Sequence, residues 1–176
     1  MRSRILLFLA FRVWLGPLGF GQEPAKAATT FEALTAHAGI FHDTVNVGVI
    51  RSHDRAILIG SGDGAILEAA KSLGIQSIDW VLYTDHHRDQ CEGAARLKKA
   101  GVKIAVPAAE ARFFRDASEI WRGADNILYD RMDFRPDMFI LRSSVDPDRE
   151  LQPGESFHWQ GIEIHLGVLV PVHVLQ

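Results

Sequence analysis

Hydrophobic and polar positions along the first part of the chain predict a hairpin followed by a helix. Residues 45–50 alternate between apolar and small or polar positions, and residues 56–59 form a second apolar run after a polar turn. Two such runs separated by a short polar turn are typical of a β-hairpin. Residues 65–73 then predict a helix, which we expect to end at Gly74.

The middle of the chain predicts a strand, a polar turn and another helix. The apolar run 80–83 indicates a buried strand, and the polar cluster T-D-H-H-R-D-Q follows it directly. A short helical pattern begins after Gly93 and ends at Gly101. Because residues 102–106 read as the next strand, the helix between the two strands predicts a right-handed parallel crossover.

The remaining part of the chain is less regular. Short helices are predicted over 108–115 and 118–122, where aromatic side chains favour a place in the core. A strand is predicted over 139–145 and a turn over 151–155. Residues 157–166 form a predicted hairpin around Gln160-Gly161.

The first residues have the order of features that is typical of a secretory signal. A basic start is followed by a long apolar stretch and then by an Ala-x-Ala site. We therefore expect residues 1–27 to be a signal peptide, residues 28–176 to be the mature domain, and the protein to be exported to the periplasm or beyond the cell. Arg12 and Pro17 interrupt the apolar stretch and argue against a stable membrane span, although an uncleaved anchor remains the alternative.

Composition adds two constraints. The 176 residues are enough for one domain, and 47% hydrophobic with 23% charged residues is ordinary for a globular protein. The net charge of −3 and the lack of a basic patch argue against a nucleic-acid partner. The single cysteine, Cys91, rules out an intrachain disulfide. It is either a metal ligand beside the polar cluster or a small residue packed at the helix start.

The polar cluster contains candidate metal ligands. Asp85, His87 and Asp89 follow a buried strand at alternate positions, and carboxylates and imidazoles are ligands for zinc and related ions. A strand-to-helix turn can direct several such groups at one ion. The alternative is an ordinary polar turn, in which Asp89 caps the helix and the histidines are solvated.

The cluster resembles the T-H-x-H-x-D-H signature of the metallo-β-lactamase superfamily. In this frame, Asp85 stands at the position of the first histidine, His87 matches the second and Asp89 matches the aspartate. Gln90 stands at the position of the last histidine, and His86 falls where the signature is variable. Aspartate can still ligate a metal, whereas a glutamine carbonyl is a poorer zinc ligand than an imidazole.

The resemblance implies an α+β fold, namely an αββα sandwich of two mixed sheets with helices outside. It covers roughly residues 45–166, so we expect the chain to represent the N-terminal half of that fold. Apolar surface left uncovered would then favour oligomers. The resemblance also implies a further metal-binding histidine late in the chain, and His173, which follows Pro171, is the candidate.

The function that the resemblance implies is metal-dependent hydrolysis. A metal-bound hydroxide would attack a small-molecule ester, lactam, thioester or phosphoester. One or two zinc ions are expected, with iron or manganese as alternatives. Asp85, His87, Asp89 and His173 are the candidate ligands, and Asp89 would also orient the attacking water.

Two other interpretations stay open. The chain could be a catalytically inactive, metal-poor remnant or ligand-binding module of the same fold, because two of the four signature ligands are replaced. A thiol enzyme at Cys91 is a weaker alternative. Asp63 lies in the glycine-rich loop before the predicted helix. It either contacts the metal ligands without binding the metal itself or caps that helix.

Overall fold

The computed structural model describes residues 30–117 and 141–167. The described strands are β1 Thr30–Ala33, β2 Ala38–His42, β3 Asn46–Ser52, β4 Arg55–Ile59, β5 Ser77–Leu82, β6 Lys103–Pro107, β7 Arg149–Leu151, β8 Ser156–Trp159 and β9 Ile162–His165. The described helices are short: α1 Ile66–Ala69, α2 Arg88–Cys91, α3 Ala94–Lys99 and α4 Ala111–Arg115.

Strands β1 to β7 form one sheet in which the spatial order follows the chain order. Strands β1 to β4 pair antiparallel, and β4 to β7 pair parallel, so the sheet is mixed. Strands β8 and β9 form a separate antiparallel hairpin. The helical crossover between β5 and β6 joins parallel neighbours, as the sequence predicts.

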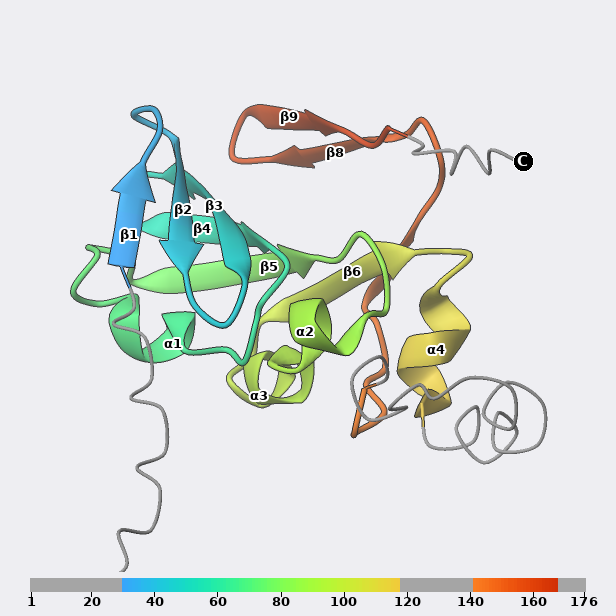
Figure 1. Cartoon of the computed structure of the whole chain (residues 1–176). Coiled ribbons are helices and arrows are strands. Elements are labelled where there is room, and N and C mark those ends of the chain that lie inside the picture. Colours follow the sequence, from blue (N-terminus) through green and yellow to red (C-terminus); the bar gives the residue numbers. More distant parts are fainter. Residues whose placement is uncertain (1–29, 118–140, 168–176) are drawn as a thin grey trace, which may run out of the picture.

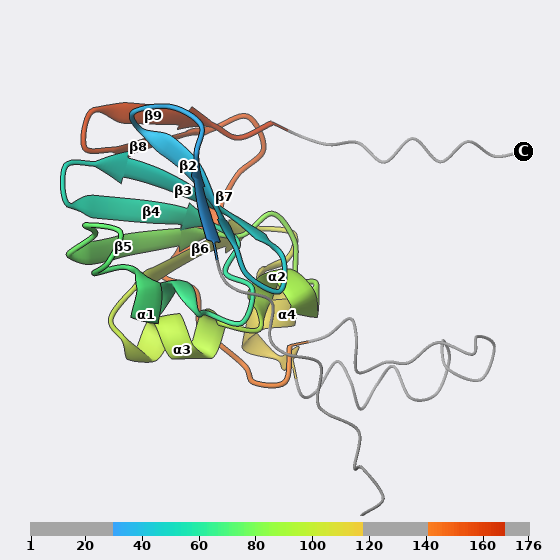
Figure 2. The ribbon, with the colours of Figure 1, turned by 60° about the vertical axis from the view of Figure 1, so that its left-hand side comes forward.

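The described elements lie in three layers. Helices α1 to α4 cover one face of the seven-stranded sheet, and the β8–β9 hairpin lies over the other face (Figures 1 and 2). This arrangement confirms the predicted α+β class, with helices outside a mixed sheet. In the described ranges, the second sheet consists of this hairpin.

The face of the sheet that carries the helices holds the larger apolar cluster. Alternate side chains of the central strands, such as Leu58, Val81 and Ile104, point to this side and are fully buried. Leu97 of α3 and Phe114 of α4 pack against them and are also fully buried. This layer therefore fixes the helices, and with them the turn that precedes α2.

The opposite face holds a smaller apolar cluster under the hairpin. Ile57, Leu82 and Leu151 of the sheet pack with Phe157 and Trp159 of β8. The apolar side chains around them, which are only partly buried, are Ile50, Ile59, Trp80, Ile162, Ile164 and Leu166.

A polar anchor joins the hairpin to the sheet. The indole nitrogen of Trp159 donates a hydrogen bond to Oδ2 of Asp79 at 2.8 Å, and Arg55 donates two more to the same carboxylate. Partial burial raises the pKa of Asp79. The hydrogen bonds from Arg55, Ser77 and Trp159 outweigh this effect and leave that pKa below its usual value.

Several predicted elements differ from the structure. Residues 139–145 do not form the predicted strand within their described part, because Val145 donates its backbone N–H to Phe114 of α4. The strand that follows is β7, which ends at Leu151, where a turn was predicted. The predicted helix over 65–73 is reduced to the single turn of α1. The predicted signal peptide (1–27) and the predicted helix over 118–122 lie outside the described residues.

Candidate active site

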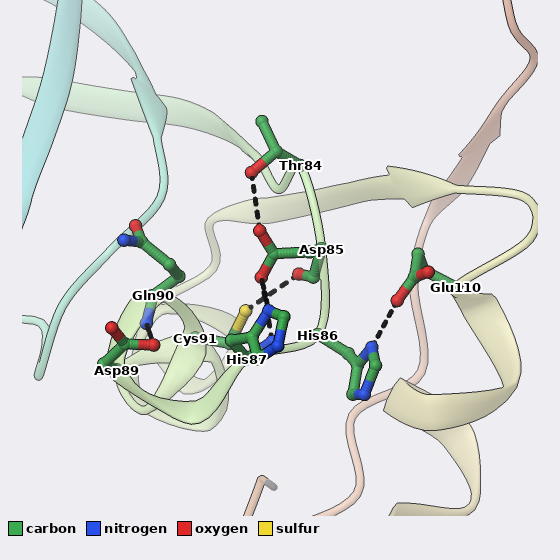
Figure 3. Close-up of polar contacts among 8 residues, drawn as sticks. All are labelled: Thr84, Asp85, His86, His87, Asp89, Gln90, Cys91 and Glu110. Carbon is green, nitrogen blue, oxygen red and sulfur yellow. Dashed lines mark hydrogen bonds and ion pairs between the residues drawn. The ribbon is translucent and has the colours of Figure 1, made fainter. Parts of the chain in front are cut away.

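The polar cluster lies where β5 ends and α2 begins, on the side of the sheet that carries the helices (Figures 1 and 3). Buried side chains hold both ends of this turn. The hydroxyl of Tyr83 donates to Oγ of Ser61 at 2.8 Å, and Cys91 is fully buried at the end of α2. Burial raises the pKa of Tyr83, so the phenol stays neutral and remains a donor.

The glycine-rich loop 60–64 packs directly against α2. Ser61 donates its backbone N–H to the carbonyl of Gln90 at 2.8 Å, and Gly93 donates to the carbonyl of Gly62 at 2.7 Å. A Cβ atom on Gly93 would lie 2.6 Å from the backbone nitrogen of Gly64, closer than atoms can approach. Glycine at position 93 therefore permits the contact that fixes the loop and the turn relative to each other.

Asp85 and His87 form a pair within the turn. Oδ1 of Asp85 accepts a hydrogen bond from the backbone N–H of His87 at 2.9 Å and lies 3.0 Å from Nδ1 of the same residue. Oδ2 accepts a hydrogen bond from the hydroxyl of Thr84 at 3.1 Å. Both side chains of the pair reach solvent, and the His87 side chain is 51% exposed.

Asp89 and Gln90 begin α2 and lie away from this pair in the close-up (Figure 3). Oδ1 of Asp89 accepts a hydrogen bond from the backbone N–H of Gln90 at 3.1 Å. Oε1 of Gln90 lies beside Gly60, where a Cβ atom would approach it to 2.9 Å. The structure therefore brings Asp85 and His87 together and does not bring Asp89 into the same contact.

His86 has partners that sequence reasoning did not identify. Its Nδ1 contacts Oε2 of Glu110, which directly precedes α4. Its ring stacks on Phe113 at a centroid distance of 4.0 Å and on His87 at 5.3 Å, with interplanar angles of 10° and 13°. The sequence carries one signal for this: Glu110 and Phe113 are three residues apart, so they share one side of a helical turn.

Cys91 and Asp63 have clear structural roles. Sγ of Cys91 donates to the carbonyl of Asp85 at 3.2 Å. Burial raises the pKa of this thiol, and Asp85, Asp89 and Glu110 raise it further, which argues against a thiol nucleophile at neutral pH. Oδ1 of Asp63 accepts a hydrogen bond from the backbone N–H of Ala65 at 2.9 Å, so this carboxylate stabilises the start of the α1 turn.

The described residues do not, as they lie, fit a metal centre. Within residues 30–117 and 141–167, no group of three or more histidine, cysteine, aspartate or glutamate side chains is placed to hold an ion. Asp85 and His87 supply two donors, which contact each other directly. His173 lies outside the described residues, so its role and those of Asp85, His87 and Asp89 as ligands stay predictions.

The comparison with protein families decides the family of the chain. The model of the metallo-beta-lactamase superfamily matches residues 41–175, which include the whole polar turn. The chain belongs to the metallo-beta-lactamase superfamily. No curated protein matches the sequence significantly. No described helix has the length and apolar character that a membrane crossing requires.

Solved metallo-beta-lactamases share the fold. The subclass B3 enzyme BJP-1 of Bradyrhizobium japonicum aligns with a TM-score of 0.59 and 17% identity, over 77% of this chain and 50% of that chain. A beta-lactamase from Chitinophaga pinensis aligns with a TM-score of 0.61 and 21% identity, over 84% and 55%. The chain thus spans about half the length of the solved structures that it matches.

A third solved structure is similar in fold. The metallo-beta-lactamase of Cronobacter sakazakii that is described by its HARLDQ motif aligns with a TM-score of 0.56 and 21% identity, over 76% of this chain and 50% of that chain. Residues 85–90 of this chain read D-H-H-R-D-Q, so both motifs end in Asp-Gln.

Proposed function

We propose that this superfamily member contributes to metal-dependent hydrolysis of a small molecule that contains an ester, lactam, thioester or phosphoester bond. The observation that supports the proposal is the place of the polar turn. Residues 85–90 follow the end of β5 at the point where the family carries its signature, and the turn is fixed from both sides by buried contacts. The activity, the substrate and the metal (zinc, or iron or manganese) belong to the proposal.

Within this proposal, the residues of the turn have different tasks. Asp89 is assigned the orientation of the attacking water, because its carboxylate is exposed at the start of α2. Asp85 and His87, in the part of the turn that precedes α2, also reach solvent. His173 remains the candidate for an additional ligand.

A second function is favoured by a specific observation. Asp85, at the position of the first signature histidine, is bonded to His87, and Gln90, at the position of the last, lies beside Gly60. A turn whose side chains bond each other in this way suits a metal-poor module that binds a ligand without hydrolysing it. Both functions use the same surface, so they are separated by what the surface binds.

Metal content distinguishes the two functions. The purified chain and its His87→Ala variant would be analysed for zinc, iron and manganese, with His158→Ala as a control for removal of an exposed histidine on the hairpin. Near-stoichiometric metal that falls only in His87→Ala supports the hydrolase. Metal at background level in all three proteins supports the ligand-binding module.

Hydrolysis itself is tested with a small panel of substrates. A chromogenic β-lactam, a thioester, a lactone and a phosphodiester cover the proposed bond types. Asp89→Asn should reduce hydrolysis of the accepted substrate, because the amide cannot take up a proton from water. Asp116→Asn, an exposed change at the C-terminal end of α4, is the matched control. Equal activity in both variants would contradict the role of Asp89.

A further inference from the structure

We propose that His86 is a positioning residue. Glu110 and Phe113 hold the His86 ring in place, and the His86 ring keeps His87 in contact with Asp85. The inference rests on the proposed function in one respect, since it concerns the same surface. It adds Glu110 and Phe113, which lie 20 and 23 residues after the end of the signature at Gln90, to the residues that shape this surface.

The first observation is that His86 is fixed in two independent directions. The contact between Nδ1 and Glu110 restrains its ring edge, and the parallel Phe113 ring, 4.0 Å away, restrains its face. The His86 side chain is 23% exposed and that of Glu110 is 26% exposed, so both partners are partly shielded from water.

The second observation is that His87 lies between a fixed ring and a carboxylate. The His86 ring lies nearly parallel to the His87 ring, with the two centroids 5.3 Å apart, and Oδ1 of Asp85 lies 3.0 Å from Nδ1 of His87. At 51% exposure, the His87 side chain has less protein around it than the His86 side chain.

The third observation is that this arrangement joins two elements. Glu110 and Phe113 lie at α4, whose Phe114 is fully buried in the core, whereas His86 belongs to the turn after β5. The contact of His86 with Phe113 therefore links the exposed His87 to α4, which is anchored in the core. For comparison, removing the groups that orient a metal-ligating histidine through hydrogen bonds typically changes metal affinity or activity by about 10–100-fold.

The test uses the histidine resonances of the full chain in solution, with His87 assigned from its loss in His87→Gln. Rings stacked on His87 displace its proton resonances. His86→Ala should abolish this displacement, whereas His86→Phe, which retains a flat ring on Phe113, should preserve most of it. His42→Ala, which removes an exposed histidine at the end of β2, is the control and should leave the His87 resonances unchanged.

Two further variants separate positioning from general stability. Phe113→Leu keeps an apolar side chain at this position but removes the flat surface, so it should shift the resonances of both His86 and His87. Glu110→Gln keeps an oxygen that accepts from Nδ1 and should retain most of the wild-type pattern. Unchanged His87 resonances in His86→Ala, or equal changes in His86→Phe and His86→Ala, would overturn the proposal.

Activity gives an independent readout when the wild-type chain hydrolyses a substrate of the panel. His86→Ala should then lower kcat by about 10–100-fold, with most of the loss recovered in His86→Phe. A wild-type chain that binds no zinc and hydrolyses nothing contradicts the proposed function. In that event, the resonances of His87 still decide whether His86 positions it.

Discussion

The two faces of the seven-stranded sheet are covered in different ways. On one face, helices α1 to α4 pack over a large cluster of fully buried side chains, including Leu97 and Phe114. On the other, the β8–β9 hairpin covers a smaller cluster centred on Phe157 and Trp159, and many of the apolar side chains around it are only partly buried. Figure 2 shows both layers from the side.

The difference bears on where stability and function are located. The candidate site lies on the helix-covered side, where Tyr83 and Cys91 fix both ends of the turn from within the larger cluster. The hairpin-covered side is held by fewer apolar contacts and by the Asp79 anchor. We therefore expect the turn to keep its shape under conditions in which the hairpin detaches.

The largest expected effect comes from removing one phenylalanine on each face. Phe114→Ala should reduce the free energy of unfolding by about 3–5 kcal/mol, because a fully buried ring leaves a cavity among packed neighbours. Phe157→Ala should cost less, because its neighbours can close over the space or the hairpin can separate locally. Urea unfolding measures both changes.

Hydrogen exchange then separates local from global loss. In Phe157→Ala, the amides of β8 and β9 should exchange faster while those of β4 and β5 stay protected. In Phe114→Ala, protection should fall throughout the sheet. Equal losses of protection in the two variants would contradict the division of stability between the faces.

The next effect concerns the polar anchor of the hairpin. Asp79→Asn weakens the bonds from Arg55 and Trp159 to a largely buried side chain, and we expect a loss of about 1–3 kcal/mol at pH 7. Because the pKa of Asp79 is lowered in the folded chain, its stabilising effect is complete above the unfolded pKa, about 4. The effect disappears as the pH falls through the lower, folded pKa.

The measurement is the difference in free energy of unfolding between wild type and Asp79→Asn as a function of pH. It should be constant from pH 7 to about pH 5 and become smaller below pH 4. A difference that grows as the pH falls would show that the carboxylate is strained rather than stabilised.

Several strands and hairpins of the fold could be predicted from the sequence. The hairpin over 45–59, the strand before the polar turn and the last hairpin follow directly from apolar periodicity and turn residues. The predicted strand over 139–145 is wrong for its described part, 141–145, because a short apolar run has no periodicity that distinguishes a strand from a loop packed on a helix. Val145 is buried against the core without joining a sheet.

The candidate site was predicted in part. The signature places Asp85, His87 and Asp89 close together in the chain, but no local pattern states that Asp85 pairs with His87 in the turn while Asp89, in α2, accepts from the backbone N–H of Gln90. The stack of His86 on Phe113 joins residues 27 positions apart. Contacts of this kind depend on how α4 packs, which is a property of the tertiary structure.

Alkylation of Cys91 tests whether the turn of the candidate site stays closed when the hairpin is destabilised. Cys91 is fully buried beneath the turn, and its raised pKa keeps the thiol protonated. Alkylation by iodoacetamide at pH 8 should therefore be at least about 100-fold slower in the folded chain than in urea. Phe157→Ala should leave this protection in place and Phe114→Ala should reduce it. Fast alkylation of the wild type would show that the turn opens readily.

The smallest effect comes from two exposed arginines, one on each side of the sheet. Arg96 of α3 pairs with Glu68, and both side chains are largely exposed, so Arg96→Gln should change the free energy of unfolding by less than about 0.5 kcal/mol. Arg149 is similarly exposed and pairs with Glu155 at 2.9 Å, but its guanidinium also lies 4.9 Å from the centre of the Phe157 ring. Arg149→Gln should therefore reduce the free energy of unfolding by more, about 0.5–1 kcal/mol.

Salt distinguishes the ion pair from the contact with the aromatic ring. Sodium chloride at about 0.5 M screens an ion pair but leaves the packing of the Arg149 side chain on the Phe157 ring largely intact. If both variants lose their effect in salt, Arg149 acts only as an ion pair, and the hairpin-covered face depends on its apolar side chains and the Asp79 anchor.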